Sequence, residues 1–200
     1  NMEIREGEFF GFVGPNGSGK TTTMKIIAGL LPADSGSVYL DGIDVINKPK
    51  ALKGKIGYMP DFFGVYDNLK VMEYMYFYAS TYGIIGDEAK KTCMELLDLV
   101  GLEDKENLYV DSLSRGMKQR LCLARTLIHD PKFLILDEPA SGLDPRARYE
   151  MKVILRDIKD RGKTILISSH ILPELAEMCT VLGIIENGRL AVTGTLDDIF

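Results

Sequence analysis

The segment GPNGSGKT at residues 14–21 constrains the fold of this 200-residue chain more than any other stretch. It follows the apolar run EFFGFV, which predicts a strand, and precedes TTTMKIIAGLL, which predicts a helix ended by Pro32. Glycine at positions 14, 17 and 19 lets the backbone curl until successive N–H groups point inward, and the start of the helix adds partial positive charge. A loop of this kind between a strand and a helix predicts a phosphate-binding unit in an α/β domain.

Each residue type in this loop has an expected task. Lys20 should reach the β- and γ-phosphates of a nucleotide, and Thr21 should offer its hydroxyl to Mg²⁺. A merely glycine-rich turn is the alternative, which the flanking strand and helix disfavour. The predicted nucleotide-binding residues are Gly14, Pro15, Asn16, Gly17, Ser18, Gly19, Lys20, Thr21 and Thr22.

Four apolar residues at 133–136 lead directly into Asp137 and Glu138, so a buried strand should end in two carboxylates. Burying an unpaired carboxylate is costly, and Mg²⁺ held among nucleotide phosphates would supply the missing positive charge. We therefore expect Asp137 to face the metal, and Glu138 to accept a proton from an attacking water or to orient it. The alternative, a pair of solvated turn acids, is disfavoured by the phosphate loop upstream.

Length and composition exclude several classes of protein. Two hundred residues suffice for one well-buried domain with a modest subdomain, and a net charge of −5 disfavours contact with nucleic acid. Three widely spaced cysteines at 93, 122 and 179 are typical of reduced core thiols in a reducing compartment. No stretch reaches the run of about 18 apolar residues that a membrane-spanning helix needs, so none is expected.

Short apolar runs alternate with helical segments along the chain, which predicts an α/β fold with a mainly parallel sheet flanked by helices. Further strands are predicted at 37–42, 56–60 and 164–169, with a hairpin at 180–194 that turns at Asn187-Gly188. Asp144 should cap a helix that starts at Pro145 and runs to about Gly162.

The composition becomes helical between two of the predicted strands. Residues 68–83 and 87–101 predict successive helices, the second opened by Asp87 and closed by Gly101, and a third helix is predicted at about 114–129. We expect an α-helical subdomain over approximately 62–125, inserted into the core of a single domain that spans residues 1–200.

The segment LSRGMKQR, residues 113–120, stands at the start of the third predicted helix, just ahead of the acidic strand. Here the sequence resembles the nucleotide-binding domains of ATP-binding cassette (ABC) transporters, whose signature reads LSGGQ, then a basic or polar residue, then QR. Arg115 and Met117 depart from that pattern. The chain keeps Leu113, Ser114, Gly116, Gln119 and Arg120.

Other landmarks follow in the order of the family, so the resemblance covers essentially the whole chain. They are the loop after IGYMP, the strand LILDEP, the segment SGLD at 141–144 that the family calls the D-loop, and His170 in SSHIL. The residues of the segments LSRGM and YMPD are most similar to those of the ATP-binding subunits of ABC-2-type exporters.

The resemblance implies a P-loop NTPase of ABC type, in which a helical subdomain is inserted into a RecA-like core. It also implies that two copies pack head to tail, so that the signature of one grips the γ-phosphate held by the phosphate loop of the other. A serine at a helix N-terminus is suited to bind an anion there. Arg115 is expected to add a cation to this grip, whereas Met117 cannot donate the amide hydrogen bond of the usual Gln. The implied interface residues are Leu113, Ser114, Arg115, Gly116 and Met117 in the signature, and Ser141, Gly142, Leu143 and Asp144 in the D-loop.

Two further residues are implied at the site. Asp61 stands where the family usually has a Gln that touches Mg²⁺ and the attacking water; an Asp can still bind Mg²⁺ but adds negative charge beside Asp137 and Glu138. The alternative is a turn residue after Pro60. His170 should contact the γ-phosphate, which makes Glu138, His170 and Lys20 the expected catalytic group, with Thr21, Asp137 and Asp61 on the metal.

Residues outside this group are expected to be structural or to meet a partner. His129 is expected at the surface, at the end of a helix. Five aromatic residues are expected either in ordinary core and helix-surface positions or around a groove for the coupling helix of a permease. They are Tyr74, Tyr76, Phe77, Tyr78 and Tyr82.

The sequence thus predicts an ATPase that uses ATP and Mg²⁺, dimerises with an identical copy and powers transport, in the direction of export, through a separate transmembrane permease. Such a cassette would lie in the cytoplasm against the inner face of the membrane. The alternative is a soluble ABC ATPase that acts as a switch or clamp in translation or chromosome maintenance. Thirteen residues precede Gly14, too few to carry the aromatic residue on which the family stacks adenine, so truncation is expected at the N-terminus and also at the C-terminus.

Overall fold

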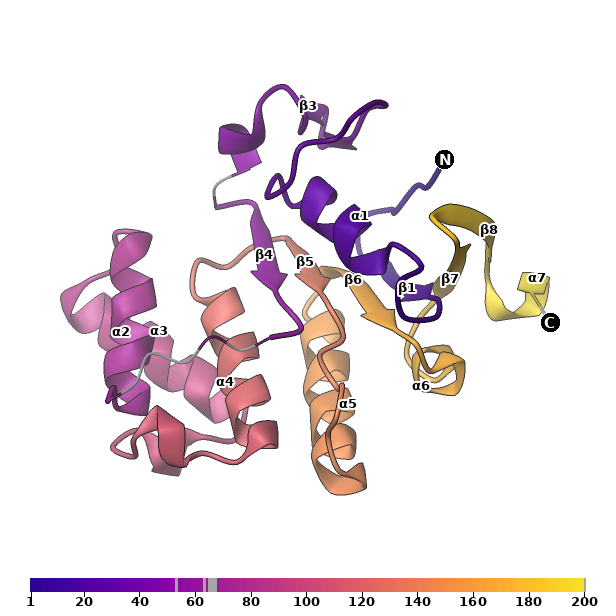
Figure 1. Cartoon of the computed structure of the whole chain (residues 1–200). Coiled ribbons are helices and arrows are strands. Elements are labelled where there is room, and N and C mark those ends of the chain that lie inside the picture. Colours follow the sequence, from indigo (N-terminus) through magenta and orange to yellow (C-terminus); the bar gives the residue numbers. More distant parts are fainter. Residues whose placement is uncertain (53, 63, 65–67, 200) are drawn as a thin grey trace.

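The computed structural model describes residues 1–52, 54–62, 64 and 68–199 (Figure 1). Its main element is a six-stranded sheet in the order β4-β5-β6-β1-β7-β8, in which β8 alone runs antiparallel to its neighbour. The strands are β1 (Phe9–Val13), β4 (Ile56–Met59), β5 (Phe133–Leu136), β6 (Thr164–Ser169), β7 (Val181–Glu186) and β8 (Arg189–Gly194). A separate pair, β2 (Tyr39–Leu40) and β3 (Ile43–Asp44), forms a small antiparallel sheet.

The central strands are apolar throughout because both faces of the sheet are covered. Along β1, Phe9 and Val13 join one apolar cluster while Phe10 and Phe12 join the other, as the two-residue period of a strand requires. Helix α1 contributes Met24 to the second cluster, and α5 packs into the first. These two helices therefore lie on opposite faces of the sheet.

Seven α-helices occur among the described residues, with short 3₁₀ turns at 49–52, 103–105 and 110–112. The helices are α1 (Lys20–Ile27), α2 (Val71–Thr81), α3 (Gly86–Leu99), α4 (Arg115–Leu127), α5 (Pro145–Asp160), α6 (Leu172–Ala176) and α7 (Leu196–Ile199).

Helices α2, α3 and α4 gather beside the β4 edge of the sheet (Figure 1). The phenol of Tyr74 is buried between them and accepts a hydrogen bond from Arg125 Nη1 at 3.2 Å. Helix α4 lies so close to β4 that a Cβ on Gly57 would come within 2.7 Å of the Thr126 carbonyl oxygen. The subdomain boundaries expected at 62 and 125 stay predictions; the first falls next to residues outside the described part, and α4 continues to Leu127.

Most predicted elements are confirmed. The strands at 56–60 and 164–169, the helix capped by Asp144 and the hairpin at 180–194 are all present. Asn187 and Gly188 have positive φ values of 49° and 74°, as a tight two-residue hairpin turn requires. Cys93, Cys122 and Cys179 are free and buried, and burial raises the pKa of the Cys179 thiol to about 12.

Three local predictions are wrong. Helix α1 ends at Ile27 rather than at Pro32, because Gly29 takes a left-handed conformation with φ 71° and breaks the helix first. Only Tyr39 and Leu40 of the segment 37–42 form a strand, and they pair outside the main sheet. Asp87 does not cap α3, which begins at Gly86; it lies in the first turn, where a carboxylate is still favourable.

No helix within the described part of the chain combines the length and the apolar character needed to cross a lipid bilayer.

Candidate active site

The loop between β1 and α1 curls as the glycine pattern predicts. Gly17 and Gly19 have φ values of 79° and 105°, a region that favours glycine. A Cβ on Gly14 would lie 2.3 Å from the carbonyl oxygen of Ile185 on β7, so this position admits no side chain. The Ser18 carbonyl accepts a hydrogen bond from the Gly188 amide at 2.8 Å, which ties the loop to the hairpin turn.

Lys20 is the buried cation at the centre of the site, with only 5% of its surface exposed. Its Nζ donates to the carbonyl oxygens of Gly14 at 2.7 Å and Pro15 at 3.2 Å, and lies 3.5 Å from Glu138 Oε1. The lysine therefore connects the phosphate loop to the acidic end of β5. The hydroxyl of Ser18 is buried nearby without a hydrogen-bond partner among the described residues, whereas Thr21 and Thr22 are exposed.

Asp137 follows β5 and is wholly buried. Its Oδ1 accepts a hydrogen bond from Ser168 Oγ at 2.7 Å, but its Oδ2 has no partner in the described part of the chain. A buried, unpaired carboxylate oxygen is costly, and a hard cation such as Mg²⁺ is the partner that it fits. The described residues contain no group of three or more His, Cys, Asp or Glu that could hold a metal alone, so phosphate and water oxygens would complete the shell.

Glu138 has a positive φ of 50°, which is a strained conformation for a residue with a Cβ. Its amide donates to Ser168 Oγ at 2.9 Å, and its carbonyl accepts from the Ser141 amide at 3.0 Å. Ser168 on β6 thus contacts both acids through one hydroxyl. Sequence reasoning missed this serine, since nothing in the run TILISS distinguishes it from an ordinary strand residue.

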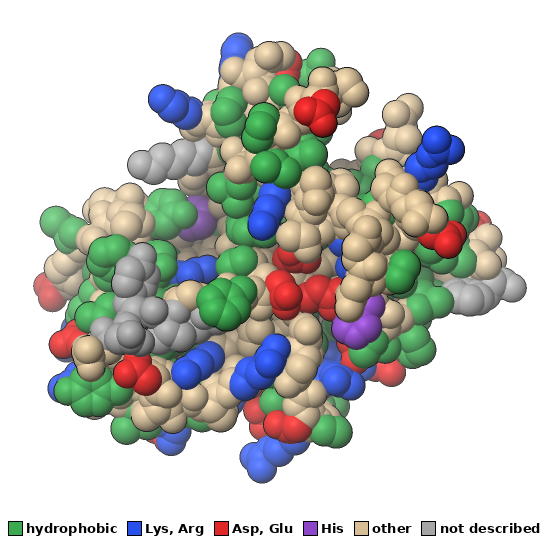
Figure 2. Space-filling view, viewed as in Figure 1, with side chains coloured by type: hydrophobic (Ala, Val, Ile, Leu, Met, Phe, Trp, Pro, Cys, Tyr) green, Lys and Arg blue, Asp and Glu red, His purple; other side chains and the backbone are tan. Residues whose placement is uncertain are grey.

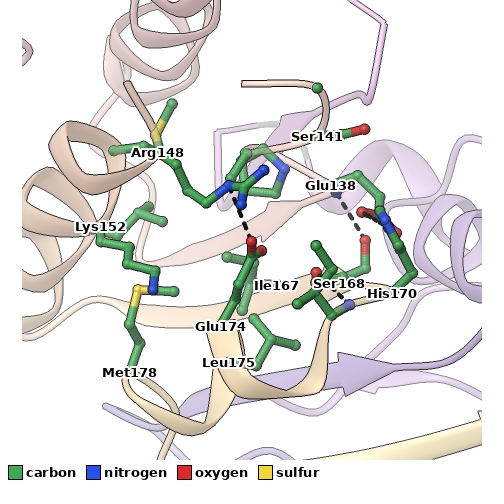
Figure 3. Close-up of a pocket in the computed structure, with 17 residues that line it drawn as sticks. Glu138, Ser141, Arg148, Lys152, Ile167, Ser168, His170, Glu174, Leu175 and Met178 are labelled. Atoms are coloured by element: carbon green, nitrogen blue, oxygen red, sulfur yellow. Dashed lines mark hydrogen bonds and ion pairs between the residues drawn. The ribbon is translucent and has the colours of Figure 1, made fainter. Parts of the chain in front are cut away.

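His170 follows β6 and places Nδ1 3.0 Å from Glu138 Oε2 (Figure 3). Its side chain is 42% exposed, whereas that of Glu138 is 11% exposed. The Glu138 carboxylate therefore lies between Lys20 on one oxygen and His170 on the other. The structure brings together the three residues that the sequence analysis expected to form a catalytic group.

Asp61 lies just after β4, close enough to Asp137 and Glu138 for their negative charges to act on it. Partial burial, followed by the negative charges of Asp137 and Glu138, raises the pKa of the Asp61 carboxyl, while Arg115 and His170 act in the opposite direction. The neighbouring Tyr58 was missed by sequence reasoning. Its hydroxyl is buried with no partner among the described residues, and burial together with Asp137 raises its pKa to about 12. In the view of Figure 2, acidic side chains gather at the centre of the molecular surface.

The signature lies at the start of α4, as expected. Ser114 is exposed, and its Oγ caps its own helix by accepting from the Met117 amide at 3.3 Å. A Cβ on Gly116 would lie 2.8 Å from Cβ of Ala147, so this glycine lets α4 approach α5 closely. Leu113 is buried and Met117 packs partly against the core. Within the described residues, no hydrogen bond joins 113–117 to 14–22.

Side chains from two helices, α4 and α5, contact the D-loop. Asp144 Oδ1 caps α5 by accepting from the amides of Arg146 and Ala147, each at 3.0 Å. Leu143 is buried, and its carbonyl accepts from Arg148, whose Nε lies 3.1 Å from Glu174 Oε1 on α6 (Figure 3). Arg115 was expected to add a cation to a phosphate grip. Within the single chain its guanidinium donates to the carbonyl oxygen of Ser141 at 3.1 Å, and the contact with a partner's phosphate stays a prediction.

His129 follows the end of α4, as predicted, but it is only partly exposed and makes contacts inside the fold. Its Nε2 lies 2.9 Å from the carbonyl oxygen of Ile56, and its ring stacks on Tyr82 with centroids 4.0 Å apart. Burial lowers the pKa of this imidazole. Of the aromatic residues, Tyr74 is core, whereas Tyr76, Phe77 and Tyr82 keep between 37% and 47% of their surface exposed.

Replacing Ser168 with alanine should remove the hydroxyl that both acids share. The buried Asp137 Oδ1 and the Glu138 amide would each lose a partner, so we expect unfolding free energy to fall by roughly 1–3 kcal/mol in denaturant titrations. Ser80→Ala, which removes only a local bond from an exposed side chain to the Phe77 carbonyl, is the control. Equal stability of the two variants would contradict this assignment.

Replacing Asp61 with asparagine should stabilise the fold at neutral pH. Because the pKa of Asp61 is raised in the native state, the native state binds more protons than the unfolded chain, and stability declines as pH rises from its ordinary pKa of 3.8 through the raised value. After discounting for solvent screening, we expect a gain on the order of 0.5 kcal/mol at pH 7 that shrinks towards pH 4. Denaturant titrations at both pH values measure it, and a gain that is independent of pH would refute this explanation.

Comparison with known proteins identifies the family. The family profile described as ABC transporter matches residues 1–141. The Nod factor export ATP-binding protein I of Burkholderia pseudomallei is 40% identical over 194 residues, which cover 97% of this chain and 64% of that protein. The chain thus spans less than two thirds of the length of the first curated relatives that it matches.

Two solved structures share the fold. The cbiO1 protein of Clostridium perfringens, part of the ABC transporter complex cbiONQ, has a TM-score of 0.91 and 29% identity, covering 100% of this chain and 82% of its own. The dimeric bacterial ABC transporter cassette MJ0796 has a TM-score of 0.88 and 27% identity, covering 98% and 88%. The profile match, which spans more than half of the chain, together with this agreement in fold shows that the chain belongs to the ABC transporter family and has the fold of its ATP-binding cassettes.

Proposed function

We propose that this cassette binds ATP and Mg²⁺ at the phosphate loop, hydrolyses ATP as a dimer and powers export through a separate transmembrane permease. The observation that carries the proposal is the position of the Glu138 carboxylate, between the Lys20 ammonium at 3.5 Å and the His170 imidazole at 3.0 Å. A mostly buried acid held by a lysine of the phosphate loop and a histidine is suited to phosphoryl transfer to water.

The loop residues 14–22 would bind the phosphates through their amides and through Lys20. Lys20 would exchange its bonds to the Gly14 and Pro15 carbonyls for phosphate oxygens, because a charged acceptor is the stronger partner. Thr21, Asp137 through its unpartnered Oδ2, and Asp61 would hold Mg²⁺, which neutralises phosphate charge when bound.

The hydrolytic step is assigned to Glu138. Its carboxylate would take a proton from a water molecule, or orient that water, as the water oxygen attacks the γ-phosphorus and the bond to the ADP oxygen breaks. His170, which is partly exposed beside it, would donate to the γ-phosphate and hold the Glu138 carboxylate in position. Ser168 keeps the backbone of Glu138 in its strained conformation.

A second copy of the chain would complete the site. The first amides of α4 have no acceptor within the helix, and Ser114 is exposed beside them. These groups suit a γ-phosphate supplied by another cassette, since the phosphate loop of the same chain makes no hydrogen bond to them among the described residues. The dimeric form of the similar cassette MJ0796 supports a homodimer in which residues 141–144 also meet the partner.

The permease is proposed to bind at a groove between α1 and α2. Ala28, Leu30, Pro49, Leu52, Tyr58 and Tyr82 are among the residues that line this groove. Leu30 is 60% exposed, so apolar surface is available there. The cassette would then lie in the cytoplasm against the inner face of the membrane, with the helical region at about 62–125 as the part that follows the permease. The export function of the Burkholderia relative supports this direction of transport.

Replacing Glu138 with glutamine should abolish turnover but keep ATP bound. Without a carboxylate to accept the proton, we expect hydrolysis to fall by roughly 10²- to 10⁴-fold, while ATP holds two copies together. Phosphate release and size-exclusion chromatography with ATP measure both effects, and Glu103→Gln, on an exposed turn, is the control. Hydrolysis at the wild-type rate in the Glu138 variant would refute the assignment.

Replacing Ser114 with glutamate should prevent this ATP-dependent dimer. A carboxylate at the start of α4 would face the γ-phosphate of the partner, and two negative charges at that range repel strongly in a partly buried interface. Asp111→Glu, two residues before the signature, keeps the local charge and serves as the control. The dimer should be lost when Ser114→Glu is combined with Glu138→Gln; a stable dimer would contradict the shared site. Recovery of the cassette with ribosomes or DNA instead of a membrane protein would favour the alternative of a soluble switch or clamp.

A further inference from the structure

Arg115 is placed where a cation is unfavourable. It is the first residue of α4, and the N-terminus of a helix already carries partial positive charge. Its side chain turns away from the helix and donates from Nη2 to the carbonyl oxygen of Ser141 at 3.1 Å. A contact that offsets this cost therefore lies within the same chain, on the D-loop.

The D-loop has a matching surface for the guanidinium. Gly142 has a φ of 66°, and a Cβ added to it would lie 2.7 Å from both Cζ and Nη2 of Arg115. The planar group thus lies against the bare backbone of Gly142 while it bonds to the carbonyl before it. Any side chain at position 142 would displace it.

The bond from Arg115 to Ser141 is connected to Glu138, the proposed catalytic acid, by one further hydrogen bond. The Ser141 amide donates to the Glu138 carbonyl at 3.0 Å, so Ser141 closes the turn in which Glu138 holds its strained φ of 50°. On the other side of Gly142, the Leu143 carbonyl is held by Arg148, which belongs to α5 and pairs with Glu174 (Figure 3). Among the hydrogen bonds of the described residues, the one from Arg115 joins residues 141–144 to α4.

We propose that Arg115 is a positioning residue that latches the D-loop to the signature helix and so keeps Glu138 in its catalytic geometry. The latch lets a displacement of α4 reach the Glu138 turn through two hydrogen bonds, one to the Ser141 carbonyl and one from the Ser141 amide. Its catalytic consequence rests on the proposed function, whereas the latch itself does not.

Hydrogen exchange in the nucleotide-free cassette tests the latch. Arg115→Ala should make the amides of residues 138–144 exchange roughly threefold to tenfold faster, as expected for the loss of one hydrogen bond. Arg146→Ala is the matched control, since Arg146 stands beside the D-loop and its side chain pairs only with Glu150 on the described surface. Exchange in the Arg115 variant that equals the wild type, or equals the Arg146 variant, overturns the proposal.

A double-mutant cycle with Gly142→Ala separates the latch from a general loss of structure. The added methyl group displaces the guanidinium, so Gly142→Ala should speed exchange in the wild type and have a smaller effect when Arg115 is already alanine. Full additivity of the two substitutions overturns the proposal.

Turnover gives the second readout. Arg115→Ala should lower kcat about fivefold or more and leave the Kd for ATP within about twofold, because the residue acts on the Glu138 turn and not on the phosphate loop. A variant whose free cassette exchanges normally, but whose ATP-dependent dimer is weakened, would show that Arg115 grips the partner's phosphate, and this overturns the latch. If the wild-type cassette hydrolyses no ATP, the proposed function fails and the exchange experiment still decides the latch.

Discussion

A buried negative charge at the end of β5 is the constraint on which the rest of the site depends. Asp137 is wholly buried with one oxygen unpartnered in the described structure, and Glu138 follows it in a strained conformation. Such an arrangement is costly unless cations and donors surround it. The 3.5 Å contact from Lys20 and the shared hydroxyl of Ser168 supply part of what is needed, and bound Mg²⁺ is proposed to supply the rest.

The order of the strands brings these groups together. Strand β6 lies between β5 and β1, so the carboxyl ends of three parallel strands meet at one edge of the sheet. The phosphate loop follows β1, the two acids follow β5, and β6 ends in Ser168 and Ser169 with His170 next. Ligand sites of open α/β sheets form at this edge, where loops diverge from neighbouring strands. A parallel sheet with more strands between β5 and β1 would separate Lys20 from Glu138.

The helical side of the molecule is connected to this edge by contacts that are individually weak. Gly116 lets α4 lie against α5, Arg120 lies 3.5 Å from Glu150 on α5, and Arg115 reaches the D-loop. Exposed polar contacts contribute little to stability but can fix a geometry. The departure of Arg115 from the family signature is therefore significant. The Arg115 side chain donates a hydrogen bond to the D-loop, whereas the glycine usual at this position of the signature has no side chain to do so.

The sequence by itself determined the phosphate loop, the acidic strand end, the Asp144 cap and the hairpin turn, because each is encoded by neighbouring residues whose backbone preferences are local. Tertiary structure alone decided that Ser168 bonds to both acids, that Arg115 holds Ser141, and that His129 is stacked on Tyr82. These partners lie 26 to 47 residues apart in the chain, as between Arg115 and Ser141 or between Tyr82 and His129. Their meeting depends on strand order and helix packing, which no local pattern of residue types specifies.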